Sequence, residues 1–162
     1  MKKLIYIFII IVLSINQSQS KEMVCNFEEV YSDGSIQKGL VLLKDNSIRY
    51  QYKDKQLFTI IHHNGNTFAV RNDDLSIVQK IDQNQNLIQE LFRFFNHETY
   101  SNKNFKKDDL LIKAEKSHNM NFYKRLSIHE KNLKLSIYFN NCENGEIHIK
   151  YFNFNPLEEY SY

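Results

Sequence analysis

The chain has little proline and glycine, two cysteines and no tryptophan. Among 162 residues there are four glycines, and Pro156 is the single proline. The glycines form neither a phosphate-binding loop nor a Gly-x-Ser-x-Gly nucleophile motif, and Cys25 and Cys142 cannot form the Cys-x-x-Cys pairs of zinc sites. No proline- or glycine-rich linker divides the chain, so we expect one domain over residues 21–162.

The ionisable residues also lack the spacings that catalytic and metal sites use. His62 and His63 are adjacent, so they would point to opposite faces of a strand. The neighbours Glu28 and Glu29 are interpreted as solvated surface residues. We expect no enzymatic activity, no metal and no other cofactor. A cysteine nucleophile with a histidine base stays open only if the two cysteines are unpaired.

The first twenty residues have the layout of a secretory signal peptide. Lys2 and Lys3 precede an apolar run from Leu4 to Leu13, and the small residues Ser18 and Ser20 follow. A membrane-spanning helix needs about 20 apolar residues, so a retained anchor is the less favoured alternative. We expect cleavage after Ser20 and export. Removing two of the 21 basic residues leaves 19 against 19 acidic ones, which provides no basic surface for nucleic acid.

An exported protein works in an oxidising compartment, where disulfides persist. We therefore expect Cys25 and Cys142 to pair; the alternative is two buried free thiols. Cys25 is not a lipid-attachment site, because Glu22, Met23 and Val24 do not form the required small-residue motif.

Most of the mature chain alternates with the period of a strand. In Asn132–Asn140, apolar and polar side chains alternate, which is typical of an antiparallel sheet covered on one face. Asp33-Gly34 and Asn64-Gly65 are turn signals. Nine further strands are predicted at Met23–Tyr31, Ile36–Lys44, Ile48–Tyr52, Leu57–His62, Thr67–Arg71, Leu75–Ile81, Leu110–Glu115, Met120–Ile128 and Glu146–Phe154.

One segment has helical periodicity instead. Between Asn86 and His97 the apolar residues recur at positions that form a single stripe on a helix, and Asn86 can cap its start. The stripe comprises Leu87, Ile88, Leu91, Phe92, Phe94 and Phe95. We expect the following stretch, Asn96–Asp109, to be a polar loop whose lysines are solvated or dock an acidic partner.

Five segments, in order, resemble motifs of the periplasmic outer-membrane lipoprotein carrier family (LolA-like). Asp33-Gly34-Ser35-Ile36-Gln37-Lys38-Gly39-Leu40 resembles the family's Gln-x-Gly-x-Leu strand opening, and Ile48-Arg49-Tyr50-Gln51-Tyr52 resembles its Phe-Arg-Trp-x-Tyr strand. The remaining similarities are Asn64–Phe68 to a hairpin, Asp74–Gln79 to a strand, and Phe152–Pro156 to a Phe-x-Phe-x-Pro close. The chain departs from the family in its short N-terminus before the first strand, and in Lys44 at a place usually held by arginine.

The resemblance implies a mainly β protein: a single curved antiparallel sheet forming an unclosed β-barrel with a short helical lid. A sandwich of two facing sheets is the alternative architecture. The implied function is that of a monomeric periplasmic carrier, which binds the acyl chains of lipoproteins in an apolar cavity. It would receive them from an inner-membrane lipoprotein-releasing transporter and deliver them to an outer-membrane receptor. The alternative function is a periplasmic lipid-sensing or interaction domain on the same scaffold, without transport.

On this reading, apolar strand positions line the cavity and helix residues close over it. The expected lining is Leu42, Tyr50, Tyr52, Phe58, Ile60, Phe68 and Val70, and the expected lid residues are Leu91, Phe92 and Phe95. Lys44 is the candidate for controlling lid closure. The inward face of each strand depends on its register, because a shift of one residue reverses every side chain.

Overall fold

The fold is a single antiparallel sheet of ten strands that curves around one helix. The structure is a computed structural model that describes residues 22–81, 86–96, 104–119, 122–144 and 152–156. The strands are β1 (Met23–Tyr31), β2 (Ile36–Lys44), β3 (Ser47–Tyr52), β4 (Phe58–His63), β5 (Asn66–Arg71), β6 (Ile77–Ile81), β7 (Asn104–Lys107), β8 (Leu110–Lys116), β9 (Tyr123–Glu130) and β10 (Leu133–Asn144).

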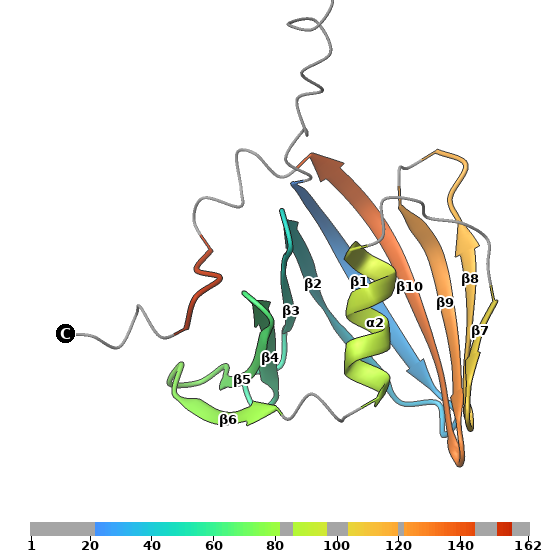
Figure 1. Cartoon of the computed structure of the whole chain (residues 1–162), viewed down its shortest axis with the longest axis horizontal. Coiled ribbons are helices and arrows are strands. Elements are labelled where there is room, and N and C mark those ends of the chain that lie inside the picture. Colours follow the sequence, from blue (N-terminus) through green and yellow to red (C-terminus); the bar gives the residue numbers. More distant parts are fainter. Residues whose placement is uncertain (1–21, 82–85, 97–103, 120–121, 145–151, 157–162) are drawn as a thin grey trace, which may run out of the picture.

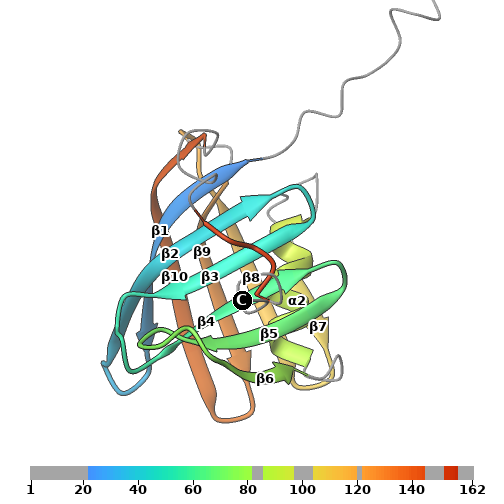
Figure 2. The ribbon, with the colours of Figure 1, turned by 90° about the vertical axis from the view of Figure 1, so that its left-hand side faces the viewer.

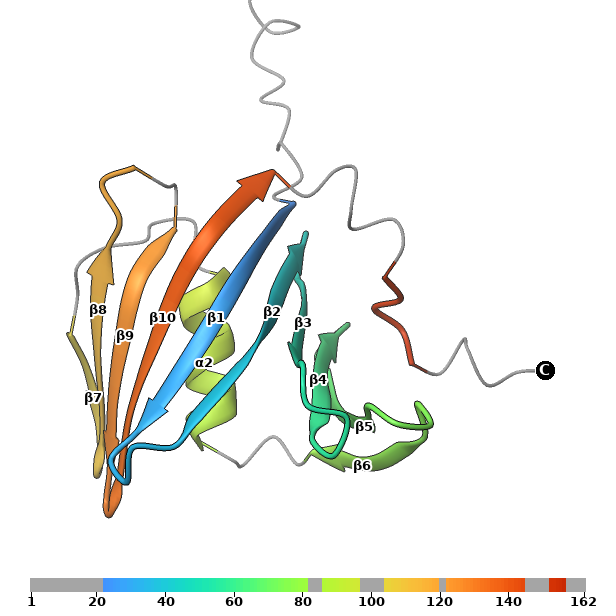
Figure 3. The ribbon, with the colours of Figure 1, turned by 180° about the vertical axis from the view of Figure 1, so that it is seen from behind.

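The strand order is β6-β5-β4-β3-β2-β1-β10-β9-β8-β7, so the sheet does not close on itself. The chain first builds a meander from β1 out to the edge strand β6. Helix α2 (Asn86–Asn96) follows, and the chain then re-enters the sheet at the opposite edge, β7. Figures 1 and 3 show the sheet bending around α2, with the two edges at opposite ends. The β1–β10 ladder is therefore the seam between two meanders.

Tight turns with left-handed residues connect the strands. Asn64 and Gly65 have φ values of 49° and 75° between β4 and β5, as the Asn-Gly signal predicted. Asp45 and Lys131 adopt φ values of 51° and 48° between β2 and β3 and between β9 and β10. These short connections hold consecutive strands in register, and Figure 2 shows the hairpins from β1 to β5 with the broad faces of their strands toward the viewer.

The predicted fold class is confirmed: the protein is mainly β, with one open antiparallel sheet rather than two facing sheets. The prediction of a polar loop over Asn96–Asp109 is wrong in part, because Asn104–Lys107 pairs with β8 as an edge strand. Its sequence, Asn-Phe-Lys-Lys, has one apolar side chain, and a segment with a single apolar residue cannot show the alternation that identifies a strand.

Other predictions differ at the ends of elements. Leu75 was assigned to a strand but lies in a turn with φ 59°, and β6 begins at Ile77. The predicted strand Glu146–Phe154 falls largely on residues outside the described ranges, and residues 152–154 are not strand. The predicted signal peptide, residues 1–20, also lies outside the described ranges. None of the helical residues that the structure describes forms a helix long and apolar enough to cross a membrane.

Candidate functional site

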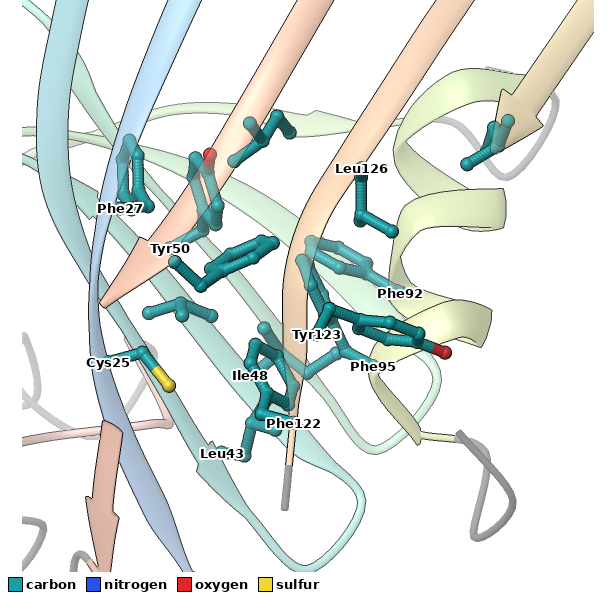
Figure 4. Close-up of a cluster of buried hydrophobic side chains, with 14 of the residues drawn as sticks. Cys25, Phe27, Leu43, Ile48, Tyr50, Phe92, Phe95, Phe122, Tyr123 and Leu126 are labelled. Carbon is teal, nitrogen blue, oxygen red and sulfur yellow. The ribbon is translucent and has the colours of Figure 1, made fainter. Parts of the chain in front are cut away.

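The concave face of the sheet holds a large apolar cluster into which α2 packs. Phe92 and Phe95 are 5% and 1% exposed. The Phe95 ring stacks near Tyr50 and Phe122, with ring centroids 6.4 Å and 5.8 Å away. Figure 4 shows helix and strand side chains converging on this cluster. The concave face is therefore filled by the side chains of the helix, whereas the sequence predicted a cavity with the helix as its lid.

Polar contacts fix the middle and the C-terminal end of α2. The Tyr123 hydroxyl donates to the carbonyl oxygen of Phe94 at 3.1 Å, which satisfies a carbonyl in the last turn of the helix. Glu90 is 2% exposed, and its Oε1 lies 2.9 Å from Arg93 Nη1 and 3.6 Å from Lys107 Nζ on β7. These contacts tie the helix to β9 and to the edge strand β7.

Phe27 on β1 lies flat across β2, and a glycine makes this possible. A Cβ atom on Gly39 would overlap both the Phe27 ring and the carbonyl oxygen of Gln51. The Phe27 ring stacks on Tyr50 with centroids 4.0 Å apart, and Tyr52 meets Phe27 edge-on at 5.4 Å. Gly39 thus allows three rings to pack directly over the sheet backbone.

Next to these rings is a buried carboxylate surrounded by tyrosines. Glu29 is only 3% exposed. Its Oε2 accepts hydrogen bonds from Tyr31 at 2.7 Å and Tyr52 at 3.0 Å, and its Oε1 accepts one from Tyr50 at 2.8 Å. Among the described residues, no lysine, arginine or histidine forms an ion pair with this carboxylate. The interpretation of Glu29 as a solvated surface residue is therefore wrong.

The strand period was the signal that could have found Glu29. It shares the face of Phe27 and Tyr31 on β1, and that face belongs to the concave cluster with Tyr50 and Tyr52 of β3. Its neighbour Glu28 points the other way and pairs with Lys38 at 2.9 Å. The alternation of side chains along β1 therefore distinguishes buried Glu29 from its neighbour Glu28, although both are glutamates in the same strand.

A pocket opens beside this cluster, at one end of the strands. Its volume is about 380 Å³. Tyr31 and Tyr52 contribute to its wall with Phe58 on β4, whose side chain is 41% exposed. The complete lining is Tyr31, Ser35, Gln37, Tyr52, Leu57, Phe58 and Ile60. Two of the three tyrosines that bind Glu29 thus also line a space that a small ligand can enter.

The structure brings together only part of the predicted cavity lining. Tyr50, Tyr52 and Ile60 belong to the concave cluster with Leu91, Phe92 and Phe95, and Phe58 lines the pocket. The predicted facing of Leu42, Phe68 and Val70 is wrong. Leu42 packs with Val24 and Phe154, and Phe68 and Val70 pack with Ile61; both clusters are separate from the concave one.

The outer face of β2 and β3 is covered by the segment 152–156. Arg49 Nη1 donates to the carbonyl oxygen of Asn153 at 2.6 Å, and its guanidinium lies 5.8 Å from the centre of the Phe152 ring. Phe154 is 7% exposed against Leu42. Both faces of β2 are therefore buried, which explains why its sequence, Leu40 to Leu43, lacks alternation.

The remaining predicted residues lie away from the pocket. Cys25 and Cys142 are joined by a disulfide across the β1–β10 seam, as expected. Lys44 is opposite Ser47 at the end of the β2–β3 hairpin, so its role in lid control stays a prediction. Three or more residues of metal-binding type do not cluster anywhere in the described ranges.

Comparison with known proteins assigns no family. The sequence matches no protein-family model, and no curated protein is significantly similar to it. Functional proposals for this chain therefore rest on its own residues and geometry.

The tyrosines around Glu29 lead to a prediction about alkaline pH. Burial, and then the charge of Glu29, raises the pKa of Tyr50 and Tyr52 far above the ordinary 10.0; burial alone raises that of Tyr123 to about 12. Their contribution to stability is complete below pH 10 and falls as the pH rises, because unfolded tyrosines lose protons first. For Tyr50 alone, we expect a loss of about 1.4 kcal/mol per pH unit above pH 10.

Urea unfolding at increasing pH, followed together with phenolate absorbance, measures this loss. Tyr50→Phe should make the decline shallower, because one titrating group is removed. Unchanged stability while the folded protein gains phenolate absorbance near pH 10 would contradict the prediction.

Proposed function

We propose that this protein binds the acyl chains of lipoproteins on its concave face and carries them through the periplasm. The observation that carries the proposal is the way in which α2 is attached. The contacts described above hold it through ring packing, one tyrosine hydroxyl and one glutamate. The strand ladders do not depend on the helix. Displacing α2 would therefore uncover an apolar concave face while the sheet stays paired.

The energetic balance is compatible with such an exchange. Each CH₂ group removed from water contributes about 0.8 kcal/mol, so a long acyl chain can replace the burial that the helix rings lose. The partners expected from the family resemblance, an inner-membrane releasing transporter and an outer-membrane receptor, belong to this proposal. A second candidate is a lipid-sensing or interaction domain without transport, which the filled concave face favours.

Weakening the docking of α2 tests the displacement directly. Phe95→Ala removes a 1%-exposed ring from the helix side of the cluster. If cargo competes with the helix, the variant populates the open state more often, and its affinity for a diacylated lipopeptide should rise by roughly 10-fold or more. Fluorescence titration with a labelled lipopeptide measures the change.

Phe68→Ala is the matched control, since it truncates a 6%-exposed phenylalanine in a separate cluster. It should leave lipopeptide affinity unchanged. An equal gain in both variants would indicate general loosening, and no binding to any form would refute the acyl-binding proposal. Transfer of the lipopeptide from donor to acceptor vesicles distinguishes the two candidates, because a sensor binds without handing over.

A further inference from the structure

We propose that the pocket between Tyr31, Tyr52 and Phe58 is a binding site for a small quaternary ammonium group. The inference is independent of the acyl-chain proposal, because it concerns the end of the strands rather than the surface covered by α2. It starts from the combination of aromatic walls with a buried carboxylate that has no cationic partner in the described part of the chain.

The pocket walls suit a cation that does not need hydrogen bonds. Three aromatic rings line it together with the aliphatic Leu57 and Ile60 and the uncharged polar Ser35 and Gln37. A quaternary ammonium group spreads its charge over methyl groups, which pack against apolar walls and are attracted by the faces of aromatic rings. The volume of about 380 Å³ is at the small end of ligand pockets, which matches a headgroup better than a large molecule.

Glu29 supplies the charge complementarity. The three tyrosine hydroxyls donate to its two oxygens, so both oxygens act purely as acceptors, as in an ionised carboxylate. A buried negative charge without a counter-ion is costly, and a cation in the pocket, on the other side of Tyr31 and Tyr52, reduces that cost. Because Tyr31 and Tyr52 donate to Glu29 and also line the pocket, donation toward the carboxylate makes their rings more electron-rich toward a bound cation.

Among the residues that the structure describes, no charged side chain lines the pocket itself. The described lining contains no lysine, arginine or other charged side chain. Of the acidic residues nearby, Glu28 lies on the opposite face of β1 and is paired with Lys38, and Asp33, which accepts hydrogen bonds from Ser35 of the lining, is exposed to solvent. The buried charge beside the aromatic walls is that of Glu29.

Comparing the affinities for choline and for its uncharged analogue 3,3-dimethylbutanol, in which carbon replaces nitrogen, tests the proposal directly. The protein is purified after expression of the full chain. Because the chain has no tryptophan, its fluorescence comes from tyrosine, and Tyr31 and Tyr52 of the lining contribute to the signal. Choline should bind roughly 10-fold more tightly than dimethylbutanol at constant ionic strength. Equal affinities, or no saturation by choline at tens of millimolar (roughly the weakest binding that such a site would show), would overturn the proposal.

Variants assign the preference to residues. Glu29→Gln should remove most of the choline preference and leave the part that comes from the ring faces, whereas Glu28→Gln, on the other face, should keep all of it. Phe58→Ala removes a 41%-exposed ring and should weaken choline binding several-fold without unfolding the protein, so the test survives if Glu29→Gln fails to fold. Unchanged choline affinity in Phe58→Ala would contradict the site.

The source of the ammonium group is separated by comparing free choline with monomeric dihexanoylphosphatidylcholine. Tighter binding of the phospholipid would identify a lipid headgroup, and equal binding would identify the free cation. A protein that binds choline but no diacylated lipopeptide would support this site and refute the acyl-chain proposal. A protein that binds the lipopeptide but no choline would refute this site and leave the acyl-chain proposal supported.

Discussion

Reducing the disulfide between Cys25 and Cys142 is expected to lower the free energy of unfolding by about 4 kcal/mol. The bridge joins residues 117 positions apart. In the chain-entropy model, a closed loop of about 100 residues restricts the unfolded chain by an amount equivalent to about 4.7 kcal/mol, and measured values are usually somewhat lower. Few single contacts in a protein of this size contribute as much.

The position of the bridge strengthens this expectation. It crosses the ladder between β1 and β10, where Val24 faces Glu143 and Asn26 faces Asn140. That ladder joins the meander β1–β6 to the meander β7–β10. Losing the bridge therefore weakens the seam that closes the two halves around α2.

Urea unfolding with and without reductant measures the effect. The double variant Cys25→Ala/Cys142→Ala is the control, because reductant should not change its midpoint. A decrease smaller than about 1 kcal/mol for the unmodified chain would show that the seam is held by its hydrogen bonds and packing alone.

Gly39→Ala is expected to destabilise the protein by about 3 kcal/mol and to disturb the tyrosine cluster. The new methyl group would overlap the Phe27 ring and a backbone carbonyl of β3. Backbone cannot move aside as a flexible side chain can, so the strands must shift or the Phe27–Tyr50 stack must break. We expect the near-ultraviolet circular dichroism of the tyrosines to change as well.

Gly34→Ala provides the matched control. Gly34 has φ 85° with no atom within 4 Å of its added Cβ, so its substitution costs only conformational strain of about 1 kcal/mol and leaves the aromatic signal unchanged. Similar losses for both variants would show that the close packing over Gly39 does not matter. Urea midpoints and aromatic circular dichroism together decide between these outcomes.

The aromatic cluster around Gly39 shows which parts of the site could be predicted from the sequence. The sequence predicted that Tyr50 and Tyr52 share an inward face and that Phe92 and Phe95 pack against it, because one strand and one helix have clear periods. It did not predict Phe27 over Gly39, since a glycine inside a strand is equally compatible with a bulge or a weak strand. Only the neighbouring strand shows which side chain uses the space.

Local patterns predicted most of the strands, the helix and the Asn-Gly turn, because these depend on short-range chemistry. The pairing of the cysteines was expected from the predicted export and not from a local pattern. Tertiary structure decided which face of β5 carries Phe68 and Val70 outward, that Phe154 covers Leu42, and that the helix rings fill the concave face. It also decided that Glu29 is buried among three tyrosines. The physical reason is that alternation defines two faces of a strand but does not say which one meets the core: that is set by partners distant in sequence.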